Sequence, residues 1–115
     1  MHELGIVTHV MKTLTDVAAE NEVTHIASVT LEVGEVSGVI REQILDCWDY
    51  MCGKRQPLFT DCKLILEPQE AVTFCGDCQQ TYPTVKYGRT CPHCGSGETW
   101  LLTGNEVNIR EIEAV

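Results

Sequence analysis

The sequence predicts an α+β (mixed α/β) protein in which two helices pack on a three-stranded sheet, with a metal-binding ribbon inserted before the last strand. Three observations support this prediction. Apolar residues recur with helical spacing in two segments, they alternate in three shorter segments, and four cysteines form two C-x-x-C pairs. With 115 residues, the chain suffices for one compact domain and a small satellite.

The helices are predicted over residues 4–19 and 40–52. In the first segment an apolar stripe recurs at three- and four-residue steps, through Leu4, Val7, Met11, Leu14 and Ala18. In the second segment the apolar side carries Ile40, Ile44, Trp48 and Met51. Gly53 is expected to end the second helix, because glycine adopts the left-handed conformation common at a helix C-terminus.

The strands are predicted over residues 26–33, 62–66 and 106–112. In the first, Val29, Leu31 and Val33 alternate with Ser28, Thr30 and Glu32, which predicts a half-buried strand. The second alternates through Cys62, Leu64 and Leu66, and the third through Val107 and Ile109. We therefore predict an α/β domain from residues 1–71 and 103–115, interrupted by a ribbon domain of residues 72–102.

The ribbon is defined by Cys75-Gly-Asp-Cys78 and Cys91-Pro-His-Cys94, with twelve residues between the pairs. Two tight turns at this spacing close a tetrahedral thiolate site, which is typical of structural zinc and leaves no position for a substrate. Gly76 and Gly95 are expected to let the backbone fold over the sulfurs. Rubredoxin-like iron is the alternative, because similar turns bind both metals.

Composition excludes some classes of function. The net charge of −9 repels phosphate backbones and disfavours nucleic-acid binding. The start lacks the basic residues of a secretory leader, and no apolar run reaches the length of a membrane span. We therefore expect a cytoplasmic protein with no membrane association. The three further cysteines, Cys47, Cys52 and Cys62, are interpreted as small, buried and inert side chains.

The sequence begins Met1-His2-Glu3, and a histidine at position two has a chelating geometry that internal histidines lack. The Met1 amine, the His2 amide nitrogen and the His2 imidazole close fused rings around one metal, and the Glu3 amide or an external donor can complete a square plane. Planar nitrogen ligation favours Ni(II) over zinc. The alternative is that His2 is a chance residue with no metal role.

No catalytic constellation is evident, so an enzyme is not expected. The sequence contains no phosphate-binding loop and no H-E-x-x-H motif. His9 falls opposite the apolar stripe and His25 precedes a strand, so both are interpreted as surface residues. His93 lies inside the second cysteine pair, where it is either an exposed turn residue or a donor to a second metal.

Together, the opening tripeptide and the late four-cysteine ribbon resemble the HypA/HybF family, the nickel metallochaperones of [NiFe]-hydrogenase maturation. The similarity covers the whole chain and includes Leu31-Glu32-Val33-Gly34 and Gly104-Asn105-Glu106. The resemblance implies nickel bound by His2, with the Met1 amine and the backbone of Glu3, as transferred cargo. It implies structural zinc at Cys75, Cys78, Cys91 and Cys94, and it leaves a nickel-binding role for His93 as a candidate only.

The resemblance also implies partners. These are a hydrogenase-maturation GTPase (HypB-like), the hydrogenase large subunit and, in some organisms, urease maturation proteins. The competing interpretations are a zinc-ribbon interaction module without nickel, a rubredoxin-like electron carrier and a nucleic-acid-binding ribbon. The α/β segment of roughly seventy residues before the first expected metal ligand, Cys75, is more scaffold than an electron carrier needs, and the acidic balance disfavours nucleic acid.

Overall fold

The computed structural model of the protein describes residues 3–115, and Met1 and His2 lie outside the described residues. The elements along the chain are α1 (Glu3–Glu20), β1 (Ile26–Gly34), α2 (Arg41–Lys54), β2 (Lys63–Gln69), β3 (Val72–Cys75), β4 (Thr81–Pro83), α3 (Thr84–Tyr87), β5 (Thr99–Thr103) and β6 (Val107–Ala114). Contacts divide them into two compact units. The first unit holds the chain up to Glu32 with Val39–Glu67 and Val107–Val115, and the second holds Val33–Gly38 and Pro68–Glu106.

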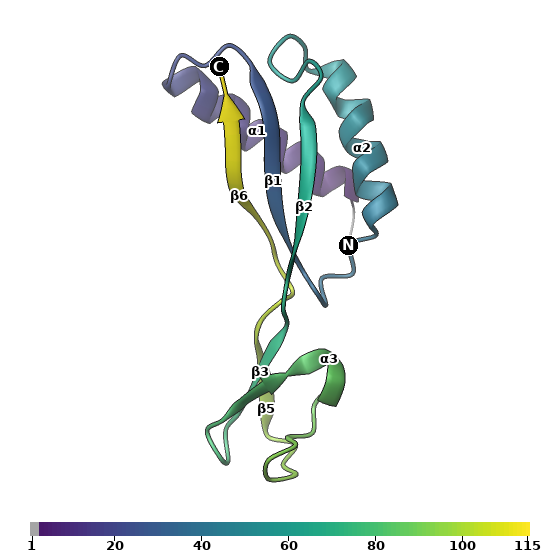
Figure 1. The fold of residues 1–115 in the computed structure, drawn as a ribbon, viewed down its shortest axis with the longest axis vertical. Helices are drawn as coiled ribbons and strands as arrows, with labels where there is room; N and C mark the ends of the chain where they lie inside the picture. Colours follow the sequence, from purple (N-terminus) through teal and green to yellow (C-terminus); the bar gives the residue numbers. More distant parts are fainter. Residues whose placement is uncertain (1–2) are drawn as a thin grey trace. The chain divides into compact units, whose positions relative to one another are not determined.

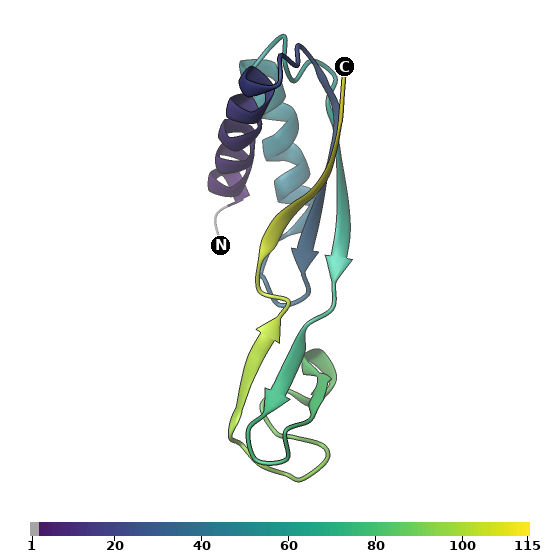
Figure 2. The same ribbon diagram turned by 90° about the vertical axis from the view of Figure 1, so that its left-hand side faces the viewer.

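The first unit is built on a three-stranded sheet with strand order β2-β1-β6. Figure 1 shows that β1 and β2 run in the same direction and that β6 runs opposite to both. Both long helices cover one face of this sheet, as Figure 2 shows from the side. This confirms the predicted fold class of two helices on a three-stranded sheet.

The core of this unit lies between the helices and the sheet. Val7, Met11, Val29, Leu31 and Ile44 are completely buried there. Leu4, the first residue of the predicted apolar stripe on α1, is exposed, whereas the rest of that stripe is buried. On β1, Ser28 and Thr30 are also buried, because this strand is central and its neighbours flank both side chains.

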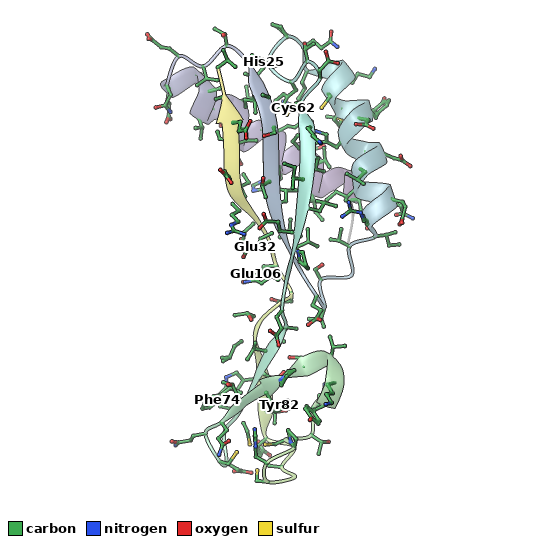
Figure 3. All side chains as sticks on the ribbon, in the orientation of Figure 1. His25, Glu32, Cys62, Phe74, Tyr82 and Glu106 are labelled. Atoms are coloured by element: carbon green, nitrogen blue, oxygen red, sulfur yellow. The ribbon has the colours of Figure 1, made fainter. Side chains whose placement is uncertain are left out.

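The end of α2 differs from the prediction. The helix continues through Gly53 to Lys54, and its C-cap is Arg55, whose N–H donates to the Cys52 carbonyl. Trp48 anchors the helix: its indole N–H donates to the Cys62 carbonyl at 3.1 Å, and its ring meets Phe59 edge-on at 6.0 Å. Cys62, which is labelled in Figure 3, immediately precedes β2. Packing against Phe59 and β2 therefore outweighs the helix-ending tendency of Gly53.

The second unit has its own three-stranded sheet, with order β4-β3-β5. Both pairings are antiparallel, with Thr73 opposite Tyr82 on β4 and opposite Leu101 on β5. The sequence analysis did not predict these strands. Tyr82 is buried, and its hydroxyl donates to the Gly88 carbonyl at 2.9 Å, which holds the end of α3 against the sheet.

At the base of this sheet the Val33–Gly38 segment is held between the chain segments that enter and leave the ribbon. Val36 N–H donates to the Gly104 carbonyl at 2.8 Å, and Glu35 N–H donates to the Gln69 carbonyl at 2.9 Å. Ala71 N–H donates to the Glu35 carboxylate at 2.9 Å. The backbones approach so closely that a Cβ on Gly104, which has φ +105°, would lie 2.4 Å from the Ala71 Cα.

Within residues 3–115, no helix combines the length and apolar character needed to cross a bilayer.

Candidate metal centre

The ribbon brings four cysteine sulfurs together. The Sγ atoms of Cys75, Cys78, Cys91 and Cys94 all lie within 4.8 Å of one another. Cys75 faces Cys94 at 3.6 Å, and Cys78 faces Cys91 at 3.6 Å. Four sulfurs around a tetrahedral zinc ion, each about 2.3 Å from it, stand about 3.8 Å apart. The observed sulfur set therefore fits a structural zinc ion.

The two cysteine turns have the same backbone hydrogen bonds. Cys75 N–H donates to the Gln80 carbonyl at 2.9 Å, and Cys91 N–H donates to the Ser96 carbonyl at 2.9 Å. In return, the Cys75 carbonyl accepts from Gln79 N–H and the Cys91 carbonyl from Gly95 N–H. The two turns present their sulfurs in the same way, which suits a shared metal ion.

The left-handed residue in each turn lies four positions after the first cysteine, and these residues are Gln79 (φ +59°) and Gly95 (φ +74°). The expected role of Gly95 fits this geometry. Gly76 has a different role: a Cβ there would lie 2.9 Å from the Trp100 ring. Gly76 is therefore small because Trp100 packs over it, a contact that cannot be read from the C-x-x-C motif.

Side chains also join the two turns. The Ser96 hydroxyl donates to the Asp77 carboxylate, and Glu98 N–H donates to the Ser96 oxygen at 3.0 Å. His93 contributes its backbone, since its N–H donates to the Cys91 sulfur at 3.4 Å. The sequence analysis missed Asp77 and Ser96 because they lie 19 positions apart. Polar residues beside metal ligands are the only indication the sequence offers.

Electrostatics favour a cation at this site. A hydrogen bond from the Cys78 backbone lowers the pKa of the Cys75 thiol to about 7. Burial raises the pKa of Cys78 to about 12. The Ser96 backbone lowers the pKa of Cys94, but burial and the neighbouring thiols outweigh it and raise the value. Without a cation, four thiolates so close together would repel one another, and a divalent metal removes that penalty.

The other candidate residues lie apart from this cluster. His93 is exposed, and among residues 3–115 the quartet is the only group of three or more Cys, His, Asp or Glu side chains placed to share a metal. Cys52 and Cys62 are buried in the first unit, as the sequence analysis expected, whereas Cys47 is only partly buried. Burial raises the pKa of Cys52 to about 11 and that of Cys62 to about 12.

The predicted nickel residues Met1 and His2 lie outside the described residues. Glu3 is described and begins α1. Its carboxylate accepts a hydrogen bond of 3.2 Å from the Ile40 N–H at the start of α2. Ile40 is the N-cap residue of α2, and no side-chain hydrogen bond from that residue caps the helix. The Glu3 contact therefore links the first residues of both helices.

The comparisons with known proteins agree with this architecture. The family model described as "Hydrogenase/urease nickel incorporation, metallochaperone, hypA" matches residues 1–114. Hydrogenase maturation factor HypA of Moorella thermoacetica is 32% identical over 109 residues, covering 95% of both chains. HypA of Chlorobaculum parvum is 30% identical over 112 residues, covering 97% of both chains. The solution structure of the Ni metallochaperone HypA from Helicobacter pylori has a TM-score of 0.79 at 21% identity, covering 100% of this chain and 98% of that one.

An α/β unit that carries a ribbon with four clustered cysteines defines a small protein with a candidate structural metal site. The chain belongs to the HypA family of nickel-incorporation metallochaperones, which act in hydrogenase maturation.

Proposed function

We propose that this protein binds Ni(II) at its N-terminus and delivers it for [NiFe]-hydrogenase maturation. The proposed donors are the Met1 amine, the His2 amide and imidazole nitrogens, and the Glu3 amide nitrogen. The observation that carries this proposal is the family match, which begins at residue 1 and includes the Met1-His2-Glu3 start. The Glu3–Ile40 hydrogen bond supports it, because it restrains Glu3, whose amide nitrogen is one of the proposed donors.

Delivery is ligand exchange without a change of oxidation state, so no enzymatic step is proposed. A planar nickel site is open above and below the ligand plane, and an acceptor's donor atoms bind before the first ligands leave. Binding displaces protons from the amine, the imidazole and the two amide nitrogens. Nickel affinity should therefore fall as the pH is lowered.

Zinc has a separate, structural role in this proposal. It would hold Cys75, Cys78, Cys91 and Cys94, and its chemistry is to neutralise and cross-link the thiolates. We place the nickel-binding α/β domain at residues 1–71 with 103–115 and the zinc-ribbon domain at residues 72–102. The proposed setting is the cytoplasm. The proposed partners are a HypB-like maturation GTPase, the hydrogenase large subunit and, in some organisms, urease maturation proteins, with neither nucleic acid nor membrane involved.

Nickel titration of untagged protein with an unmodified Met1 tests this function. We expect one planar Ni(II) site, which His2→Ala removes while the zinc content stays unchanged. His9→Ala is the matched control, because His9 is exposed on α1 and should leave nickel binding intact. One glycine added before Met1 should also abolish the planar absorption. Unchanged nickel stoichiometry in His2→Ala would favour the zinc-ribbon interaction module instead.

A further inference from the structure

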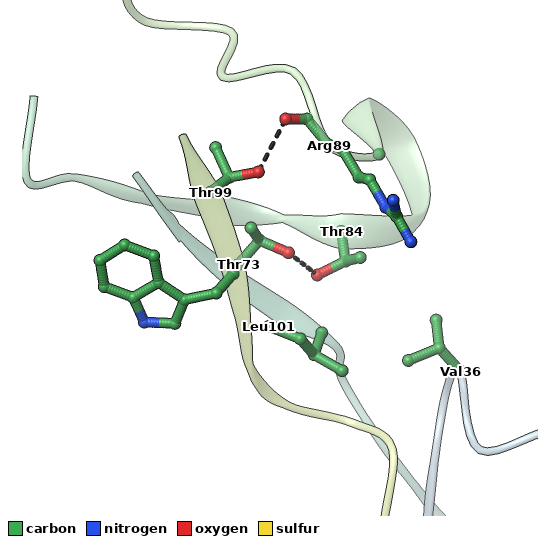
Figure 4. A pocket seen from close by; sticks show the side chains of 8 residues that line it. Val36, Thr73, Thr84, Arg89, Thr99 and Leu101 are labelled. Atoms are coloured by element: carbon green, nitrogen blue, oxygen red, sulfur yellow. Dashed lines mark hydrogen bonds between the residues drawn. The ribbon is translucent and has the colours of Figure 1, made fainter. Parts of the chain in front are cut away.

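The second unit contains a pocket of about 340 Å³ on one face of its sheet. Figure 4 shows six of its lining side chains, and they come from the sheet, from the α3 region and from the segment that holds Val36. They are Val36, Thr73, Thr84, Arg89, Thr99 and Leu101. The metal-site cysteines do not line this pocket.

Hydroxyl groups line the floor of the pocket. The Thr73 and Thr84 hydroxyl oxygens lie 2.6 Å apart, and the Thr73 residue is only 3% exposed. Whichever hydroxyl accepts this bond keeps its own hydrogen for another acceptor. The Thr99 hydroxyl donates to the Arg89 carbonyl at 2.7 Å, which fixes the backbone of Arg89 (Figure 4). The pocket therefore presents a spare hydrogen-bond donor beside an anchored arginine.

The charge at this pocket is opposite to that of the chain. Arg89 and Lys86 are the only Lys or Arg residues in 68–106, in a protein of net charge −9. No Asp or Glu lines the pocket. Within residues 3–115 the Arg89 guanidinium forms no ion pair, whereas Arg110 is paired with Glu67. A guanidinium without an ion pair, in a pocket that is also lined by hydroxyl groups, is suited to bind an anion.

The apolar side chains that line the pocket indicate which class of anion it binds. Val36 and Leu101 are apolar, so the bound group should carry apolar atoms beside its charge. A guanidinium binds a planar carboxylate through two parallel hydrogen bonds. A dianionic phosphate would meet stronger repulsion from the acidic chain and would have one arginine to offset it. A carboxylate next to an apolar side chain fits the pocket best.

Residues around the pocket indicate whether the bound carboxylate belongs to a polypeptide or to a small molecule. Val85, which follows the lining residue Thr84 in sequence, is 63% exposed. An exposed apolar residue next to a lining residue suits an extended polypeptide better than a free metabolite. The C-terminus of a second copy is a poor occupant, because Val115 N–H donates to the His25 carbonyl at 2.8 Å and the Val115 oxygen accepts from Thr24.

We propose that the Arg89 pocket binds the C-terminal carboxylate and apolar last side chain of a partner polypeptide. This proposal does not depend on nickel binding. It assigns the ribbon unit a recognition role in addition to its structural metal. Arg89 holds the carboxylate, the Thr73–Thr84 pair donates the second contact, and Val36 and Leu101 contact the side chain.

The test uses ¹H–¹⁵N NMR titration of the zinc-loaded full chain. The probes are N-acetyl-leucine, its uncharged amide, and the tetrapeptide acetyl-Gly-Gly-Gly-Leu with a free carboxylate. We expect the tetrapeptide to bind at least as tightly as N-acetyl-leucine, both saturating in the range of about 1–10 mM. The shifted amides should include those of Thr84, Arg89 and Leu101. The uncharged amide should cause no saturable shift.

Three variants check the assignment. Arg89→Gln should weaken tetrapeptide binding about tenfold or more, because it removes the charged half of the ion pair. Lys86→Gln removes the neighbouring exposed cation and should change binding by less than about twofold. Thr84→Val preserves the side-chain shape and should also weaken binding. Equal binding of the uncharged amide, or unchanged binding in Arg89→Gln, would overturn the carboxylate site. Binding of N-acetyl-leucine without the tetrapeptide would overturn the polypeptide source.

Discussion

At the scale of the residue, the pKa of a cysteine thiol depends on whether it lies in a ribbon turn or in the apolar core of the first unit. Cys75 lies in a turn whose backbone N–H groups point at its sulfur, and that hydrogen bonding lowers its pKa to about 7. Cys52 and Cys62 lie in the apolar core of the first unit, and burial raises their pKa values to about 11 and 12. The same side chain is thus suited to hold a metal in the ribbon and to pack as an inert core residue beside Trp48.

This difference predicts selective alkylation. Iodoacetamide reacts with thiolates, and a thiol with a pKa of about 11 is about one-thousandth ionised at pH 8. In zinc-loaded protein we expect Cys47, which is only partly buried, to react well before Cys52 and Cys62. Peptide mass spectrometry measures the order, and Cys47→Ser should remove the fast site. Modification of Cys52 at the rate of Cys47 would contradict the buried assignment.

At the scale of the element, the ends of the helices depend on distant partners. Hydrophobic periodicity places α1 and α2, but Ile40, the N-cap of α2, is hydrogen-bonded by Glu3, which lies 37 positions earlier. In the same way, Gly53 continues α2 because Trp48 and Cys52 next to it are buried. Local sequence therefore predicts where a helix lies better than where it ends.

The base of the ribbon gives a prediction for a single glycine. Gly104→Ala puts a Cβ into the Ala71 backbone at a φ of +105°, so either the strand or the Val33–Gly38 segment must move. We expect a loss of about 1–3 kcal/mol in the free energy of unfolding, measured by urea denaturation. Gly97→Ala is the matched control, because a Cβ there has no neighbour within 4 Å. Equal stability of Gly104→Ala and Gly97→Ala would refute the predicted clash with Ala71.

At the scale of the whole molecule, two cores of different kinds are joined by a few chain segments. The first unit buries large apolar side chains, including Trp48, Phe59 and Met11. The cluster beside the second unit's metal site consists of Cys75, Tyr82 and Cys91, with Cys78 packed against it. So small an apolar cluster stabilises a fold poorly without a cross-link. The metal would supply that cross-link.

Removing the metal should therefore affect the two units differently. For Cys91→Ser, or after treatment with a strong zinc chelator, we expect amide protection to be lost in β3, β4 and β5 and kept in α1, α2 and β1. Hydrogen exchange with mass spectrometry measures both regions in one sample, and Cys47→Ser is the control. Full ribbon protection without zinc would show that the thiol site is not needed for this fold.

The sequence by itself indicated the two long helices, the three strands of the first unit and the two cysteine pairs, in their order along the chain. These features depend on periodicity and on short spacings, which are local properties of the chain. It also indicated the family through Met1-His2-Glu3 and the paired cysteines. By contrast, the ribbon strands are too short and too polar to show a clear period, and they were not predicted.

Only the tertiary structure decided how distant residues meet. It placed Trp100 over Gly76, Glu3 at the start of α2, and Arg89 beside the paired hydroxyls of Thr73 and Thr84. The physical reason is that these contacts arise from strand register and packing, which bring together residues that are far apart along the chain. A sequence pattern does not report the spatial distance between residues that are far apart along the chain.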